Sequence, residues 1–508
     1  MRQSIYEQIH SAVNKSGQLD SDFSLPSEDT NGDITFAPGA WDGMLRYHLS
    51  TNEQDMKEEL QHWACIIEMA SQRQVGQAIL EAEKYGLNHS IYPLSDDIVR
   101  YLMDHENDLN LGEIIYFGIQ LLLKANEKEA VKLGFLLLEL FELEDLELYK
   151  TIIRTLALYD EFTFYAGFHM QNWRNGNQEI FDAAKKVTGW GRIHLVDKLK
   201  PETEEIKLWL LTEGINNDVM PDYSALTIYH KADLIDHLKA PIDHDLYCGI
   251  SNVISALLSE EPVMGISTIE EKEELLGTFL QVARSRKDLR TEDYSAILDV
   301  IDYVSDKESL LHLKKEGDEL INDSVKKKIL QETKKGNSFG LAIRLDLPYE
   351  ADAYRFVQKD FQKYDWLAGD LIKKGYHLEE LLDFLEENII LSKYICVPDQ
   401  GSMEYQRKLV PDIFDFILQS IRHHVGFGQQ FIRTGICSWK RRLQNGAIKV
   451  MQCWIEDTGL SLKEISPELQ EFLETAISVL ICDDEVIDQL IAIRDNTYST
   501  MQNRDNDS

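Results

Sequence analysis

Helix-breaking residues are scarce in this chain. Its 508 residues include only 11 Pro and 28 Gly. In a helix interior Pro costs about 3 kcal/mol and Gly about 1 kcal/mol relative to Ala, so long stretches without them are free to stay helical. Few segments have a strand pattern, and those that do are too short to form the main sheet of a fold. The sequence therefore predicts an all-α fold.

Basic residues are in the minority. Lys and Arg number 52 against 88 Asp and Glu, which gives a formal net charge of −36. A surface of this sign repels phosphate groups, so we expect neither nucleic acid nor an anionic membrane as a partner. The one basic cluster of note, residues 440–442 (KRR), is interpreted as a solvated helix face.

Disulfide and membrane signals are also missing. No apolar run approaches the about 20 residues of a membrane span, and the N-terminus has no apolar signal core. The cysteines show no CxxC spacing, which predicts free thiols in a reducing compartment. We therefore expect a cytoplasmic location. The six cysteines are Cys65, Cys248, Cys396, Cys437, Cys453 and Cys482.

Short helical patterns follow one another from residue 53 to residue 493. Helices of this kind bury their apolar stripes by packing on their neighbours in the sequence. Gly and Pro residues between these helices predict helix pairs with a period of roughly 35–45 residues. Such a period is typical of an irregular HEAT-like α-solenoid or a stack of helix pairs. An irregular helical bundle of several subdomains is the alternative. These helix-breaking residues are Gly176, Gly189, Pro201, Gly214 and Pro221.

The chain is expected to have four parts. These are an N-terminal helix and anchoring loop at 1–52, a first helical array at 53–262, a second and more charged array at 263–495, and a frayed polar tail at 496–508. No long linker rich in Gly, Ser or Pro separates the two arrays. The boundary between them is placed at Pro262, where two glutamates and a proline end the helical pattern.

The most unusual segment, residues 36–43, reads FAPGAWDG. Its PG and DG dipeptides are turn signals, and its aromatic residues gain most when they are buried. We therefore expect Trp41 to be a buried anchor. Asp42, Arg46 and His48 follow this turn and can line a pocket against the first helices, which makes them candidate catalytic residues. The alternative for Asp42 is a capping or turn-stabilising role.

Cofactor motifs are incomplete. Residues 189–191 (GWG) and 426–428 (GFG) begin like the dinucleotide fingerprint GxGxxG, but its third position holds His194 in one and Phe431 in the other. Neither segment follows an expected strand, which the fingerprint requires. No GxxxxGK[ST] phosphate loop is present. The motifs therefore indicate no cofactor.

The best metal-like set consists of His230, Asp233 and His237, at positions i, i+3 and i+7 of an expected helix at residues 223–238. Imidazoles and carboxylates are ligands of zinc and non-haem iron. The first and last of these residues lie about 10 Å apart along a straight helix, which is too far for one ion. We therefore expect no bound metal there, although Asp243 and His244 nearby could add donors.

Three segments resemble a group of bacterial helical-repeat proteins that carry the label limonene hydroxylase. They are residues 36–43 (FAPGAWDG), 189–194 (GWGRIH) and 217–220 (NDVM). The resemblance implies hydroxylation of a cyclic monoterpene, with oxidation of the resulting alcohols by NAD. It brings no catalytic residues that map onto this sequence. The chain also lacks haem, flavin and nicotinamide signatures, which puts that activity in doubt.

Two functions follow from these observations. The first is a non-enzymatic scaffold that holds a protein partner, as helical arrays commonly do. Its support is the acidic surface, the short helices and the incomplete cofactor motifs. The second is a monoterpene monooxygenase or alcohol dehydrogenase, which the resemblance implies. Whether the chain is an enzyme is therefore left open by its sequence.

Overall fold

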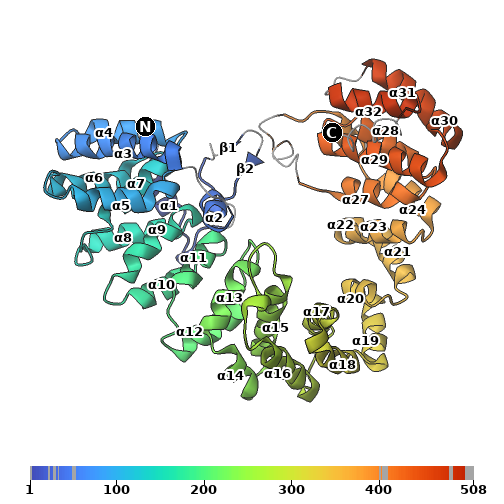
Figure 1. Cartoon of the computed structure of the whole chain (residues 1–508), viewed down its shortest axis with the longest axis horizontal. Coiled ribbons are helices and arrows are strands. Elements are labelled where there is room, and N and C mark those ends of the chain that lie inside the picture. Colours follow the sequence, from blue (N-terminus) through green and yellow to red (C-terminus); the bar gives the residue numbers. More distant parts are fainter. Residues whose placement is uncertain are drawn as a thin grey trace. The chain divides into compact units, whose positions relative to one another are not determined.

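The computed structural model describes residues 3–20, 23–26, 30–31, 34–48, 53–399, 402, 405, 410–479 and 484–497. Among these residues the only strands are β1 (Thr30–Asn31) and β2 (Ile34–Thr35), which form one short antiparallel ladder. Helices make up the rest of the ordered secondary structure (Figure 1). The predicted all-α fold is confirmed. None of the described helices combines the length and apolar character needed to cross a bilayer.

The chain divides into two compact units, residues 1–321 and residues 322–508. The boundary expected at Pro262 lies inside the first unit, because the helices before and after it, α15 and α17, pack against each other. Most of the tail expected at 496–508 falls outside the described residues, which end at residue 497.

The first unit contains eighteen α-helices and four short 3-10 or π turns, labelled η, among its described residues. They are α1 (Ile5–Ser11), α2 (Ala40–Tyr47), α3 (Glu53–Ser71), α4 (Val75–Gly86), η1 (Tyr92–Leu94), α5 (Ser95–Asp104), α6 (Leu111–Lys124), α7 (Lys128–Leu138), α8 (Glu147–Leu156), α9 (Asp160–Gln171), α10 (Gly176–Ala184), α11 (Trp190–Lys198), α12 (Glu204–Trp209), η2 (Leu210–Gly214), α13 (Asp222–Lys231), α14 (Leu234–Lys239), α15 (His244–Ser259), η3 (Ile266–Thr268), α16 (Lys272–Ser285), α17 (Tyr294–Val304), η4 (Glu308–Leu310) and α18 (Leu311–Leu320).

The second unit is built in the same way. Its described elements are α19 (Asp323–Thr333), α20 (Phe339–Arg344), α21 (Glu350–Lys359), α22 (Phe361–Tyr364), α23 (Trp366–Lys373), α24 (Leu378–Asn388), α25 (Ser392–Ile395), α27 (Ile413–Ser420), η5 (Ile421–His423), α28 (Gln429–Ile436), α29 (Arg441–Thr458), α30 (Leu462–Ile465), α31 (Pro467–Val479) and α32 (Asp484–Arg494).

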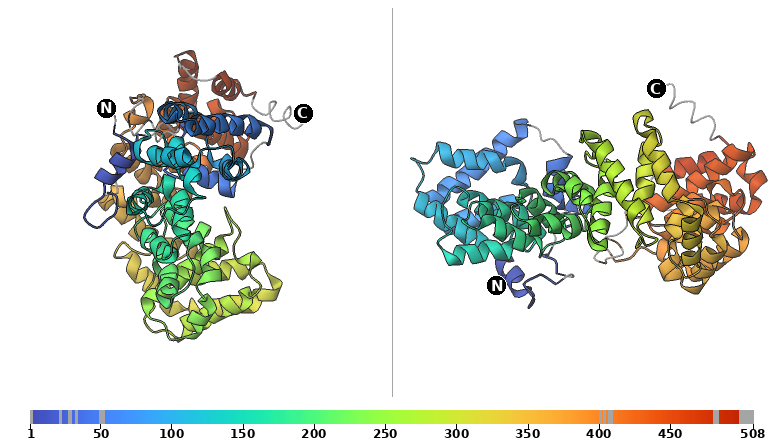
Figure 2. Two further views of the ribbon diagram at one scale, coloured as in Figure 1. Left: turned by 90° about the vertical axis from the view of Figure 1, so that its left-hand side faces the viewer. Right: turned by 90° about the horizontal axis from the view of Figure 1, so that it is seen from below.

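Helices of the first unit pack on close neighbours in the sequence. Adjacent helices form pairs, as in α3 with α4, α6 with α7, and α8 with α9. Alternate helices also touch, so that α5, α7, α9, α11, α13, α15 and α17 contact one another in succession. Figure 2 shows this order as a gradual change of colour from one helix to its neighbour within the unit. These contacts are the kind that stacked helix pairs make.

The helix α7 is the most deeply buried element of the first unit. Every residue from 130 to 138 is buried, and α7 contacts α4, α5, α6 and α9. Eight of these nine residues are apolar or glycine, as a core helix requires, but the third is Lys132. A lysine at 1% exposure needs charged partners, since an isolated buried ammonium costs several kcal/mol.

The basic cluster at residues 440–442 differs from its interpretation as a solvated face. Lys440 is buried and its Nζ lies 3.0 Å from Oδ2 of Asp412. Arg442 donates from Nε and Nη2 to the carboxylate of Asp415, at 2.6 and 2.8 Å. These side chains connect the N-terminal turn of α29 to that of α27, so they are structural ion pairs of the second unit.

Candidate functional site

Residues 36–43 dock onto α9 and α11 through two glycines. Gly39 has a φ of 74° and donates its N–H to Oε2 of Glu161 at 2.8 Å. A Cβ at Gly39 would lie 2.9 Å from the backbone oxygen of Asp160, and a Cβ at Gly43 would overlap the indole ring of Trp190. Both positions therefore need glycine, because the backbone approaches its neighbours too closely for any side chain.

Trp41 is not the buried anchor of this segment, contrary to the sequence prediction. Its side chain is half-buried and packs against the ring of Phe36, with centroids 5.2 Å apart. The buried residues of α2 are instead Asp42 and Gly43. The face of α2 that points inward therefore carries Asp42 and Gly43 and not Trp41. Asp42 is buried there because it pairs with the buried Lys132.

Three carboxylates surround the buried Lys132 ammonium. Its Nζ lies 2.9 Å from Oδ2 of Asp42, 2.8 Å from Oε1 of Glu129 and 2.6 Å from Oε1 of Glu161. Tyr165 completes this group, which we call the Lys132 cluster, by donating its O–H to Oδ2 of Asp42 at 3.2 Å. Asp42 reaches the cluster from α2, while the other residues belong to α7 and α9. The cluster therefore joins the N-terminal segment to the core.

The charges of the Lys132 cluster do not cancel, since three carboxylates face one ammonium. Burial raises the pKa of Asp42 to about 7, although Lys132 opposes this shift. Burial acts on Glu161 in the same direction, but Lys132, Lys128 and the Gly39 N–H outweigh it and lower the pKa of Glu161 to about 2. Burial also raises the pKa of Glu129, so Asp42 and Glu129 are the two carboxyls of the cluster that take up a proton at a higher pH than usual. Oδ1 of Asp42 is buried and has no hydrogen-bond partner among the described residues.

The Asp42→Asn variant should become more stable relative to the wild type as pH rises from 5 to 8. A carboxyl whose pKa is raised by folding contributes stability below its unfolded pKa, and this stability is lost as pH rises through about 7. The loss amounts to up to about 1.4 kcal/mol per pH unit, and Asn cannot ionise. Denaturant unfolding of both proteins at each pH measures the difference.

Comparing the wild type with Asp42→Asn at the same pH cancels the contributions of other titrating groups to the unfolding free energy. Burial lowers the pKa of His169 to about 4 and that of His194 to about 3, so both imidazoles affect stability over the same range. They are present in both proteins and cancel in the difference. A difference in unfolding free energy that stays constant from pH 5 to pH 8 would show that Asp42 does not titrate there.

A cavity of about 380 Å³ opens beside the Lys132 cluster. Its walls come from α2, η1, α5, α7, α9 and α11, and Tyr165 lines it while bonding to Asp42. Two cations, Arg46 and Lys198, lie near the Phe164 ring, at 5.4 and 5.3 Å from its centroid. We call this cavity the Arg46–Lys198 pocket. Its lining residues are Arg46, Tyr92, Pro93, Ser95, Asp96, Phe135, Leu136, Glu139, Phe164, Tyr165, Phe168, His169 and Lys198.

The two cations of the pocket differ in their partners. Arg46 forms an ion pair with Asp197. Lys198 rests 3.0 Å above the centroid of the Phe168 ring, and no carboxylate of the described residues lies within ion-pair distance of its Nζ. Burial and the nearby Arg46 together lower the pKa of Lys198 to about 8, although the carboxylates of Asp197 and Glu139 oppose this shift. Lys198 is thus a half-buried lysine that feels two carboxylates at a distance but forms no direct ion pair among the described residues, which is unusual for a charged side chain at this depth.

The three candidate catalytic residues do not converge. Asp42 lies in the Lys132 cluster, and Arg46 lies in the pocket. His48 is exposed and its Nε2 lies 2.8 Å from the Tyr223 hydroxyl. Tyr165 therefore contacts Asp42 and shares the pocket with Arg46, whereas His48 belongs to a separate contact on α13.

The three segments that carry the family resemblance meet in one region. Residues 36–43 lie on Trp190, and Asp218 donates its N–H to the Thr188 oxygen at 2.8 Å. The glycines of the 189–191 segment admit the Asp160 carboxylate, because a Cβ at Gly191 would lie 2.6 Å from its Oδ1. This GWG segment therefore places a carboxylate at the N-terminus of α11, where helix dipole and N–H groups favour an anion.

The set of His230, Asp233 and His237 is not brought together. The helix expected at 223–238 breaks into α13 and α14, because Asp233 adopts a left-handed conformation with φ of 46°. Asp233 pairs with Lys207, and His237 lies 3.6 Å from Glu204. No Gly or Pro marks this break, so the sequence offers no signal for it.

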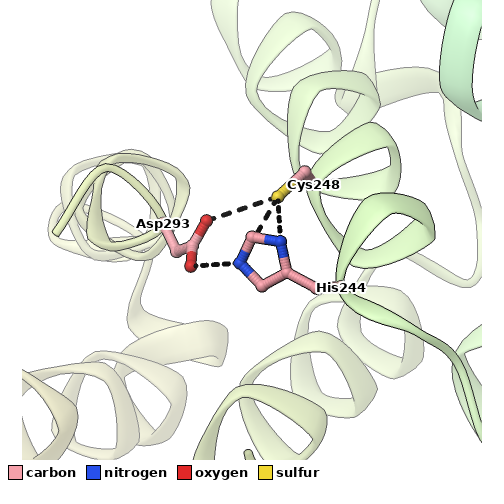
Figure 3. Close-up of side chains that lie close together, drawn as sticks. All are labelled: His244, Cys248 and Asp293. Atoms are coloured by element: carbon pink, nitrogen blue, oxygen red, sulfur yellow. Dashed lines mark hydrogen bonds and ion pairs between the residues drawn. The ribbon is translucent and has the colours of Figure 1, made fainter. Parts of the chain in front are cut away.

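A different set meets between α15 and the start of α17. His244 and Cys248 project from one face of α15 towards Asp293, as Figure 3 shows. The Nε2 of His244 lies 3.0 Å from Oδ2 of Asp293, and Sγ of Cys248 lies 3.4 Å from both Nδ1 of His244 and Oδ1 of Asp293. Burial, followed by Asp293, raises the pKa of the Cys248 thiol to about 11.

Comparison with protein families and with curated proteins found no match to this chain.

Proposed function

We propose that this chain is a cytoplasmic scaffold that binds a protein partner, and that the Arg46–Lys198 pocket receives an acidic group of that partner. The observation that carries this proposal is Lys198, a half-buried cation of the pocket that forms no direct ion pair among the described residues. A ligand that places an anion between Lys198 and Arg46 would give Lys198 a direct ion pair, while Arg46 keeps its own with Asp197.

The pocket walls favour an acidic group that adjoins an apolar one. Phe164 and Phe168 offer ring faces, and Leu136 adds aliphatic surface. Asp96 and Glu139 also line the cavity, so an anion is favoured only near the two cations and not throughout. This combination of charge and aromatic surface resembles the centres of protein interfaces, where Arg and aromatic residues predominate.

Helix packing supports a scaffold. The pocket lies where α5, α7, α9 and α11 follow one another, each contacting the next. Stacks of helix pairs use such successive helices as extended binding surfaces. The cytoplasmic location rests on the cysteines, since the five described ones, all except Cys482, are free thiols.

The aromatic lining of the pocket also suits the second function, hydroxylation of a cyclic monoterpene. Phe135, Phe164 and Phe168 can contact a hydrocarbon ring, and about 380 Å³ lies within the usual range of ligand pockets. The two cations have no use with such a substrate, because limonene carries no charge. The acidic ligand is therefore the first proposal and the monoterpene the second.

Binding of two small probes distinguishes these proposals. We expect phenylacetate, which joins a carboxylate to an aromatic ring, to bind the wild type and to lose at least about tenfold in affinity in Lys198→Gln, which corresponds to about 1.4 kcal/mol. Lys200→Gln, an exposed lysine two positions further on, is the matched control and should bind like the wild type. Isothermal titration calorimetry with phenylacetate and limonene measures both. Saturable binding of limonene with no binding of phenylacetate would favour the hydroxylase.

A further inference from the structure

His244, Cys248 and Asp293 each offer one donor atom, and these three atoms lie within 4.8 Å of one another. The Nε2 of His244 lies 3.8 Å from Sγ of Cys248 and 3.0 Å from Oδ2 of Asp293, and the sulfur lies 3.4 Å from Oδ1. In a tetrahedral zinc site, with Zn–S of about 2.3 Å and Zn–N or Zn–O of about 2.0–2.2 Å, neighbouring ligand atoms are roughly 3.3–3.6 Å apart. The distances of 3.0–3.8 Å among the imidazole nitrogen, the sulfur and the two carboxylate oxygens are therefore close to those between ligands of one zinc ion.

We propose that His244, Cys248 and Asp293 bind one zinc ion. Imidazole nitrogen, thiolate sulfur and carboxylate oxygen are the three donor types that zinc accepts in proteins. Among the described residues this is the one group of three or more His, Cys, Asp or Glu side chains whose donor atoms all lie within 4.8 Å of one another. Three protein ligands leave a fourth position for water, as in zinc sites that act as Lewis acids.

Two helices hold the ligands in place. His244 and Cys248 are four residues apart on α15, so they lie on the same face one turn apart. The first turn of α15 is capped by Asp243, whose Oδ1 accepts the Leu246 N–H at 2.9 Å. Asp293 precedes α17, is 8% exposed, and accepts the Arg290 N–H on Oδ2 at 2.6 Å. Such backbone support orients ligands before the ion arrives.

Zinc would replace the hydrogen bonds that now connect the three side chains. The thiol of Cys248 must lose its proton to become a ligand. That proton can pass to Nδ1 of His244, 3.4 Å away, while the proton on Nε2 leaves when the metal binds there. One proton, equivalent to that of the Cys248 thiol, is thus released to solvent for each ion bound, and no atom changes oxidation state.

Metal titration of the full chain tests this site. After removal of metal by a chelator, the wild type should bind one Zn²⁺ per chain by equilibrium dialysis and elemental analysis. Cys248→Ala and His244→Ala should each weaken binding by at least about 100-fold, because each removes a ligand. The double variant His230→Ala/His237→Ala should bind zinc like the wild type. Co²⁺ in place of zinc should give a sulfur-to-metal charge-transfer band that Cys248→Ala lacks.

Asp293→Asn provides a second variant that keeps an oxygen for the Arg290 N–H while removing the charge, so it should fold and still bind zinc more weakly. Unfolding midpoints of all variants show that each protein is folded. Zinc that binds Cys248→Ala as tightly as the wild type would overturn the proposal. So would a wild type that binds no zinc at micromolar concentration, or a Co²⁺ complex without the charge-transfer band.

Discussion

Replacing Lys132 with Met should destabilise the first unit by about 3–5 kcal/mol, the usual cost of removing one partner from a buried ion pair. Methionine has a similar length and fills the space, so the loss reports charge and not packing. Without the ammonium, Asp42, Glu129 and Glu161 are left as buried carboxylates within a few ångströms of one another. Denaturant unfolding followed by near-ultraviolet circular dichroism measures the change.

The pH dependence of this loss separates charge from other causes. The three carboxylates can relieve their repulsion by taking up protons, so Lys132→Met should lose less stability at pH 5 than at pH 8. Lys84→Met is the control, because Lys84 is exposed on α4 and has no ion pair among the described residues. A loss below about 1 kcal/mol at pH 8 would mean that water reaches the cluster and that the N-terminal segment does not depend on it.

Gly43→Ala should destabilise the protein although alanine is the better helix former. Helix propensity alone predicts a gain of about 1 kcal/mol for this change inside α2. The added methyl group would overlap the Trp190 ring, so either the ring moves or α2 lifts from α11. Overpacking of this kind costs typically about 1–3 kcal/mol, and lifting α2 would also remove Asp42 from Lys132. Denaturant unfolding, together with proteolysis of the N-terminal segment, measures both effects.

Gly76→Ala is the matched control, since Gly76 lies in α4 and a Cβ there would meet no atom within 4 Å. It should be neutral or stabilising by up to about 1 kcal/mol. Combining Gly43→Ala with Trp190→Leu tests the mechanism, because the smaller side chain makes room for the methyl group. Equal effects of Gly43→Ala in the presence and absence of Trp190 would contradict the contact as the cause.

The helical fold was predictable because it depends on local signals. The scarcity of Pro and Gly and the period of apolar residues act over one or two turns, which sequence reasoning captures. The end of α13 and the start of α14 at Asp233 were not predictable. An aspartate adopts the left-handed conformation only occasionally, and no Gly or Pro lies beside it to mark the end of a helix. The boundary expected at Pro262 was likewise misplaced, because packing between α15 and α17 continues across it.

The candidate site was predictable only in part. Asp42 and Arg46 were found because they follow a turn signal, but Lys132 and Glu161 lie in helices far away in the sequence. One signal could have found the cluster: residues 130–138 read AVKLGFLLL, and a lysine inside so apolar a run needs a buried partner. Cys248 and Asp293 are separated by 45 residues, and no spacing rule connects them.

The proposed function is tested most directly by comparing what the pocket captures. Tagged wild type, Lys198→Gln and Lys200→Gln would each be used to capture proteins from the lysate of the source cells, with quantification by mass spectrometry. The proposal predicts that at least one protein is enriched by the wild type and by Lys200→Gln and is lost with Lys198→Gln. Equal capture by all three proteins, or no enrichment by the wild type, would contradict a scaffold that binds its partner through the Arg46–Lys198 pocket.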